Sequence, residues 1–193
     1  MRLLAVIGAV LIVAIAGITA YIYLGYYDIS ATSPHIDLVR EALDLAMEKS
    51  VEQHAGEVAT RPSLDNPELV KGGIHHYIEQ GCFGCHGAPG RRRAEFAEQM
   101  SPKPPDLSKA ASQWSDAVLF WIVKHGIKMT GMPAFGPSHS DEELWQIVAL
   151  VRRLPHISAT EFAQLSGAAA EGDHGGEAGA EAGHGAAPKQ HRP

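Results

Sequence analysis

The stretch CFGCHGAPG at residues 82–90 contains both cysteines of the 193-residue chain. Two residues separate Cys82 from Cys85, and His86 follows directly. This is the C-x-x-C-H spacing of covalent haem attachment. Two thiols at this spacing can reach the two vinyl groups on one porphyrin edge and become thioethers. The adjacent histidine then lies under the iron as a neutral ligand. The motif predicts one covalent haem c with its iron.

Other chemistries also use closely spaced cysteines. A dithiol redox motif normally belongs to a βαβ unit, and a structural zinc site usually needs four ligands. The sequence shows no βαβ pattern and no second cysteine pair. A structural disulfide with only two intervening residues would be unusual. Haem attachment is therefore the favoured interpretation.

A second axial ligand is expected, because an electron-transfer haem commonly has histidine and methionine on its iron. Three methionines follow the motif: Met100, Met129 and Met132. Met132 lies in TGMPAFG (130–136), where glycine and proline let a loop approach the porphyrin face. Met129 is the direct rival, and Met100 could simply fill a gap in the core. We expect Met132 to be the ligand.

The first segment has no charge from Leu3 to Tyr27. As a helix, these residues would rise about 37 Å, enough to cross a hydrocarbon core of about 30 Å. Arg2 is the nearby positive charge, which favours a cytoplasmic N-terminus. A cleaved signal peptide ending near 17–20 is the alternative, although the apolar run exceeds the usual length. We expect a retained single-pass anchor in the cytoplasmic membrane, with the haem domain on the periplasmic side.

The charge balance argues against nucleic acid as a partner. The chain has 16 basic and 22 acidic residues, a net charge of −6, and no zinc-finger or helix-turn-helix pattern. The run 91–93 is a basic patch, either simply solvated or able to steer an acidic redox partner.

Helical periodicity and capping signals predict an all-α fold. A helix over Pro34–Ala55 has Ser33 as its expected N-cap and should pack on its own domain, with a partner-binding stalk as the alternative. The other expected helices begin near Pro67, after Ser115 and after Ser140, and a short one is possible within 91–100. Residues 101–108 should be extended, because positions before proline avoid helix.

Composition divides the chain into four parts. They are a membrane anchor (1–27), a juxtamembrane helix and linker (28–65), a haem domain (66–165) and a Gly/Ala/His tail (166–193). The tail lacks bulky apolar residues and is expected to be disordered.

Three motifs in order resemble class I c-type cytochromes over about residues 66–155. These are CFGCHG, PPDL at 104–107, and GIKMTGMPAFG at 126–136, which is followed by DEELWQIVALVRRLP. The region SPHIDLVREALDLAMEKS (33–50) is similar to that of membrane-anchored, single-haem bacterial members.

The resemblance implies roles for individual residues. Cys82 and Cys85 would form the thioethers, His86 would be the proximal ligand and Met132 the distal one. The carbonyl of Pro105, or alternatively that of Pro104, would accept the second N–H of His86 and so tune the iron. The residues expected to wall the haem are Leu107, Ile127 and Phe135. Trp114 or Trp121 would either bind a propionate or pack in the core.

The family's first and last helices cross closely, with a glycine and an aromatic residue on the first. Here Gly73 and Tyr77 would face Trp145 and either Val148 or Leu150. Tyr77 lies one residue further from Cys82 than is usual, and Gly81 is expected to absorb the extra residue.

These features predict an electron carrier of a respiratory chain, not an enzyme, with no small-molecule substrate. Its partners would be redox proteins, most simply membrane oxidoreductases. One alternative is a haem subunit of a larger membrane oxidoreductase complex, and another is a haem enzyme or gas sensor with an open distal position. We assign no role to the three histidines His75, His76 and His125.

Overall fold

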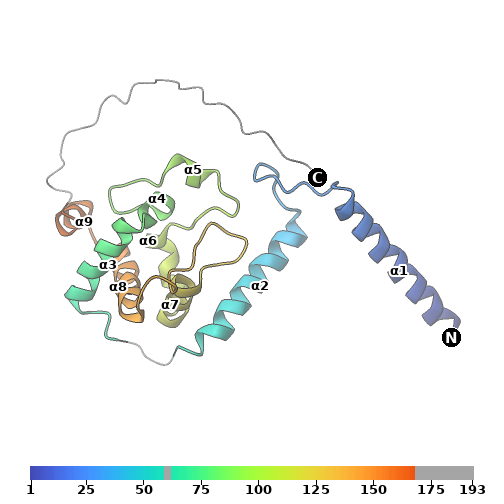
Figure 1. The fold of residues 1–193 in the computed structure, drawn as a ribbon, viewed down its shortest axis with the longest axis horizontal. Coiled ribbons are helices and arrows are strands. Elements are labelled where there is room, and N and C mark those ends of the chain that lie inside the picture. The colour runs from blue at the N-terminus through green and yellow to red at the C-terminus, as the bar shows by residue number, and fades with distance from the viewer. Residues whose placement is uncertain (59–61, 168–193) are drawn as a thin grey trace, which may run out of the picture.

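A computed structural model describes residues 1–58 and 62–167. This part of the chain is helical, with one isolated bridge between Ala88 and Arg91 and no longer β-ladder among the described residues. The α-helices are α1 (Arg2–Tyr23), α2 (Asp37–Ala55), α3 (Pro67–Glu79), α4 (Cys82–His86), α5 (Glu95–Glu98), α6 (Leu107–Ala110), α7 (Asp116–His125), α8 (Asp141–Arg153) and α9 (Ala159–Leu165). Two 3-10 turns lie at Ala111–Gln113 and Leu154–His156. The all-α prediction is confirmed (Figure 1).

The core forms where α3 and α8 cross. Tyr77 and Ile74 of α3 are almost completely buried, as are Leu144, Val148 and Leu150 of α8. Gly73 lies at the closest approach, against Gln146 and Leu150. The predicted crossing of these two helices is therefore confirmed, with Leu150 as a partner, whereas the backbone of Gln146 was not predicted as one.

Helix starts follow the capping signals where a side chain reaches the free backbone N–H groups. Asn66 accepts a hydrogen bond from the N–H of Glu68, and Pro67 is the first residue of α3. Ser115 caps α7 through the N–H of Val118. Ser140 and Glu143 form a reciprocal capping box on α8. The predicted starts of these three helices are correct.

The predicted start of the 34–55 helix is wrong by one turn. The helix α2 begins at Asp37, with Ile36 as its N-cap. Ser33 lies three residues before the observed N-cap, and its hydroxyl donates to Asp28. The helix expected within 91–100 shrinks to α5, and α9 was not predicted.

Only the C-terminal half of α2 packs on the domain. Val51 and Ala55 form a small buried cluster with Val118 of α7, and the end of α2 near residue 55 approaches α7 (Figure 1). Nearer the N-terminus of α2, Leu38 and Leu45 are exposed. Packing on its own domain is thus confirmed for one half of the helix.

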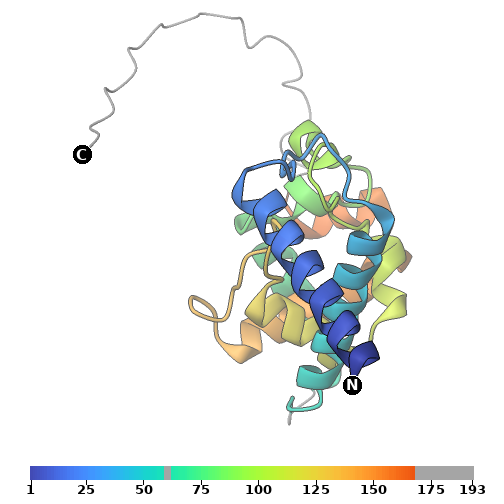
Figure 2. The same ribbon diagram turned by 90° about the vertical axis from the view of Figure 1, so that its right-hand side faces the viewer.

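Helix α1 stands apart from the helical domain (Figure 1), and in the view from its own side it lies in front of that domain (Figure 2). No residue of α1 is buried. Its length and composition suit either a membrane anchor or a signal sequence. Most of the tail expected to be disordered, residues 168–193, lies outside the described residues.

A polar link joins α7 and α8. The Arg152 guanidinium binds the Asp116 carboxylate and donates to the carbonyls of Ala111 and Trp114. Asp116 is 7% exposed. Three acceptors from one segment are thus gathered around one cation of α8.

Candidate functional site

The two cysteines lie on the short helix α4. Gly81, with φ 69°, makes the turn between α3 and α4. Cys82 and Cys85 are half-buried and form no disulfide. Burial raises the pKa of the Cys82 thiol to about 11, with a smaller contribution from Cys85. Both sulfurs are therefore free to bond to another group.

His86 is held by the backbone carbonyl of Pro105. Its Nδ1 lies 2.8 Å from the carbonyl oxygen of Pro105. A carbonyl only accepts, so Nδ1 carries the proton and the neutral ring keeps its lone pair on Nε2. Burial lowers the pKa of His86, the bond to Pro105 opposes this, and the charge of Arg93 adds to the lowering. The neutral ring therefore presents a lone pair on Nε2 that could bind a metal ion.

The carbonyls of Pro104 and Pro105 accept hydrogen bonds from different side chains. The Pro105 carbonyl accepts from His86, and the Pro104 carbonyl accepts from Nη1 of Arg93. The structure therefore does not have the alternative arrangement, in which the Pro104 carbonyl would accept from His86.

The three methionines after the motif have distinct surroundings. Met132 is half-buried and packs against the main core, while Met129 is 82% exposed and has a left-handed φ of 63°. The N–H of Met132 bonds to the Thr130 hydroxyl at 3.1 Å. The terminal methyl of Met100 lies against Gly131, beside Met132. Of the two candidate ligands in this loop, Met132 packs against the core and Met129 is exposed to solvent.

The loop containing Met132 folds back onto the end of α7. The N–H groups of Phe135 and Gly136 bond to the carbonyls of Val123 and Lys124 at 3.1 and 2.9 Å. Gly126 ends the helix with φ 66°, and a Cβ there would lie 2.7 Å from the Met132 carbonyl oxygen. The loop thus satisfies the last carbonyls of α7 and lies tight against its end.

The expected wall residues are all partly buried. Leu107 and Phe135 pack against the same core cluster as Met132, and Ile127 is half-buried. Trp114 packs against both this core and the smaller cluster of Val51, Ala55 and Val118. Trp121 packs against that smaller cluster, with its ring 5.6 Å from that of His54 and 4.8 Å from that of His125. The two tryptophans therefore share the α2 side, and Trp114 also contacts the main core.

The residues present fit a covalently bound haem. They supply two free half-buried thiols, an imidazole with its lone pair on Nε2, and an inward methionine on a tightly held loop. Across residues 1–58 and 62–167, no group of three or more His, Cys, Asp or Glu residues could hold a metal ion by itself.

The family model described as cytochrome c oxidase, cbb3-type, subunit III matches residues 68–151. Residues 68–151 form a cytochrome c domain. The matched region contains the cysteine motif, the Pro104–Pro105 segment and the Met132 loop. No curated protein and no solved structure matches the chain.

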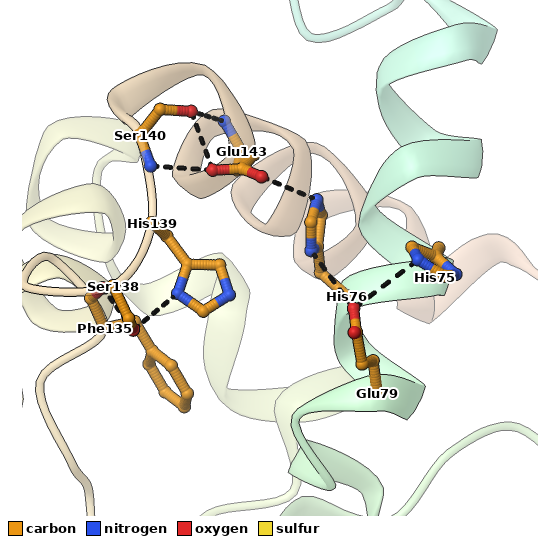
Figure 3. Close-up of polar contacts among 8 residues, drawn as sticks. All are labelled: His75, His76, Glu79, Phe135, Ser138, His139, Ser140 and Glu143. Atoms are coloured by element: carbon orange, nitrogen blue, oxygen red, sulfur yellow. Dashed lines mark hydrogen bonds and ion pairs between the residues drawn. The ribbon is translucent and has the colours of Figure 1, made fainter.

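The cytochrome c domain also contains polar groups that sequence reasoning left without a role. His76 lies at the α3–α8 crossing with its side chain 13% exposed, and its Nε2 is 3.9 Å from Glu143 Oε1 (Figure 3). Its Nδ1 is buried, has no hydrogen-bond partner, and lies 4.0 Å from Glu79 Oε2. The ring of His139 packs edge-on against those of both His76 and Phe135. This histidine cluster links the helix crossing to the Met132 loop.

Sequence reasoning also missed two side chains of the cytochrome c domain. Tyr77 donates from its hydroxyl to the Gly87 carbonyl at 2.6 Å, which ties α3 to the residue after the motif. The sequence does not distinguish Arg93 from the two arginines before it, yet Arg93 is the one bound to Pro104. Neither contact has a signal in local sequence.

Proposed function

We propose that this protein is a membrane-tethered, mono-haem c-type cytochrome that transfers electrons, with His86 and Met132 as its axial ligands. The observation that carries the proposal is the hydrogen bond from His86 Nδ1 to Pro105, which leaves Nε2 as a lone-pair donor. The inward position of Met132, opposite in sense to that of Met129, supports the second ligand.

The bound haem would supply an iron that changes between Fe(III) and Fe(II). The chain's contribution is to fix and shield that group. Cys82 and Cys85 would attach it, while Leu107, Ile127 and Phe135 would exclude water from its edge. Such burial and His/Met ligation favour a relatively high reduction potential.

The apolar helix α1 supports a tether in the cytoplasmic membrane, with the cytochrome c domain on the periplasmic side. A tether raises the effective concentration near membrane-bound redox partners. The matching family is named for a subunit of a cbb3-type oxidase, which also supports a haem subunit of a larger complex. Gentle detergent extraction and size analysis would distinguish a lone carrier from a complex.

The axial ligands are tested by the optical spectra of Met132→Ala and Met129→Ala beside wild type. We expect Met132→Ala to lose the weak red absorbance of an iron–sulfur bond and Met129→Ala to keep it. Met129→Ala is a matched control, since it removes the same side chain from the same loop. Retention of the band in Met132→Ala would refute the ligand assignment.

Covalent attachment is tested by denaturing the purified protein and extracting it with acidified organic solvent. Haem joined by Cys82 and Cys85 should stay with the chain, and the denatured chain should show no free thiol. Carbon monoxide binding to the reduced wild-type protein would instead indicate an open distal position.

A further inference from the structure

The three consecutive arginines at 91–93 differ in their surroundings. Arg91 lies over the Phe83 ring, with its guanidinium carbon 4.1 Å from the ring centroid, and Arg92 is exposed. The side chain of Arg93 is only 16% exposed. Its Nη1 donates to the Pro104 carbonyl, and its Nε lies 3.1 Å from Glu98 Oε1. Arg93 is therefore fixed at two points, whereas Arg91 lies over Phe83 and Arg92 is exposed.

The partner of Arg93 is the residue next to the acceptor of His86. Pro104 precedes Pro105, and a residue before proline is restricted to extended ψ values, so the direction of the Pro104 carbonyl is closely set. The first carbonyl accepts from Arg93 and the second from His86. His86, Arg93 and Leu107 line the same cavity of about 350 Å³. A shift of one carbonyl would move the other.

We propose that Arg93 is a positioning residue that holds the Pro105 carbonyl against Nδ1 of His86 and thereby sets how strongly the imidazole donates to the iron. This rests on the proposed function, because it takes His86 as the axial ligand. A partner that fixes the second nitrogen of a ligating histidine orients the ring and raises its basicity.

The position of Arg93 depends on the planar, forked geometry of its guanidinium group. One planar guanidinium reaches the carboxylate of Glu98 and the carbonyl of Pro104 from different nitrogens. A lysine would supply the charge but only a single donor centre, so it could not hold both partners in fixed directions. Arg93→Lys therefore separates the geometric role from the charge.

The test uses the intact, haem-loaded protein in its reduced, diamagnetic form. Proton NMR would follow solvent exchange of the His86 Nδ1–H in wild type, Arg93→Lys, Arg93→Gln and Arg92→Gln. We expect exchange to accelerate about tenfold in both Arg93 variants, the effect of losing one supported hydrogen bond. Arg92→Gln is the matched control, because it removes an adjacent exposed charge, and its exchange should equal that of wild type.

The midpoint potential gives a second readout. Arg93→Lys keeps the charge and weakens the hydrogen bond, so the imidazole donates less and the potential should rise. In Glu98→Gln, Arg93 keeps its hydrogen bond to the Pro104 carbonyl but loses its ion pair with the Glu98 carboxylate. The solvent exchange rate of the His86 Nδ1–H and the midpoint potential should therefore both lie between those of wild type and Arg93→Lys. Because Glu98 is a half-exposed surface residue, this variant should fold even if the Arg93 variants do not.

The inference is overturned if exchange and potential in both Arg93 variants match those of Arg92→Gln while the iron–sulfur band is intact. Failure of the proposed function has a different signature. Wild type itself would then lack covalent haem or the His/Met spectrum.

Discussion

Gly73 of α3 lies directly against the backbone of Gln146 of α8. A Cβ added at Gly73 would lie 2.8 Å from the Gln146 carbonyl carbon and 2.8 Å from Leu150 Cβ. Atoms of the main chain cannot rotate aside, so the two helices would have to separate. The distance between α3 and α8 is set by the absence of a side chain at this position.

We expect Gly73→Ala to lower the free energy of unfolding by about 2 to 3 kcal/mol, as for other overpacked cores. The adjacent Gly72→Ala is the control, since the nearest atoms to its Cβ would belong to the flexible side chain of Gln146. That side chain can move, and alanine is the better helix former by about 1 kcal/mol. Gly72→Ala should thus be neutral or slightly stabilising in denaturant titrations. Equal losses in both variants would contradict a backbone contact.

Arg152 should contribute far more to stability than its neighbour. Arg152→Gln removes the guanidinium from buried Asp116 and from two carbonyls. Loss of one member of a buried ion pair typically costs about 3 to 5 kcal/mol, and the partial exposure of Arg152 suggests the lower end. Arg153→Gln breaks only a half-exposed pair with Glu161 at 3.6 Å and should cost less than about 1 kcal/mol. Similar thermal unfolding of the two variants would refute this assignment.

The capping box at the start of α8 is a third target. Ser140→Ala removes an acceptor for the N–H of Glu143 and should cost about 1 kcal/mol. Ser140→Asp keeps an acceptor at this position and should restore most of the loss. Chemical denaturation compares them, and failure of aspartate to rescue would indicate that the serine acts otherwise.

Acid stability should depend on Asp106, the N-cap of α6. Hydrogen bonds from the Ser108 hydroxyl at 2.6 Å and from its N–H at 3.1 Å lower the pKa of Asp106. A carboxyl with a lower pKa in the folded than in the unfolded state stabilises the fold above its unfolded pKa of about 3.9. That contribution is lost as pH falls through the folded pKa.

We therefore expect the unfolding free energy of wild type to drop between about pH 5 and pH 2.5 more than that of Asp106→Asn. Ser108→Ala should flatten the dependence in the same direction, because it removes the largest cause of the shift. An unchanged pH profile in both variants would show that this cap does not contribute.

Sequence reasoning succeeded where the decisive interaction is local. Ser115 and Ser140 cap helices through groups three residues away, and such short-range chemistry is visible in the chain itself. The same signal was present at the start of α9, where Ser158 accepts from the N–H of Glu161 at 3.1 Å, and was overlooked. The prediction of Ser33 as a cap is wrong, because α2 begins at Asp37, three residues later than a cap at Ser33 requires.

The site was predictable in part for a similar reason. Short-range spacing identified Cys82, Cys85 and His86 as candidates, and a glycine- and proline-containing loop favoured Met132 over Met129. The distinct position of Arg93 depends on where the chain places Pro104, eleven residues on. The half-buried position of His76 depends on α8, far along the sequence. No local pattern contains either relationship.

The return of the Met132 loop onto α7 restricts how a methionine ligand could leave. Its last part supplies the N–H groups that cover the carbonyls of Val123 and Lys124. Swinging the whole loop outward would uncover the end of a buried helix, so that motion belongs with partial unfolding of the domain. Opening confined to residues 128–132, which include Met132, breaks neither of these two bonds. Ligand exchange should therefore be a local event, and the amide protons of Phe135 and Gly136 should stay protected while it occurs.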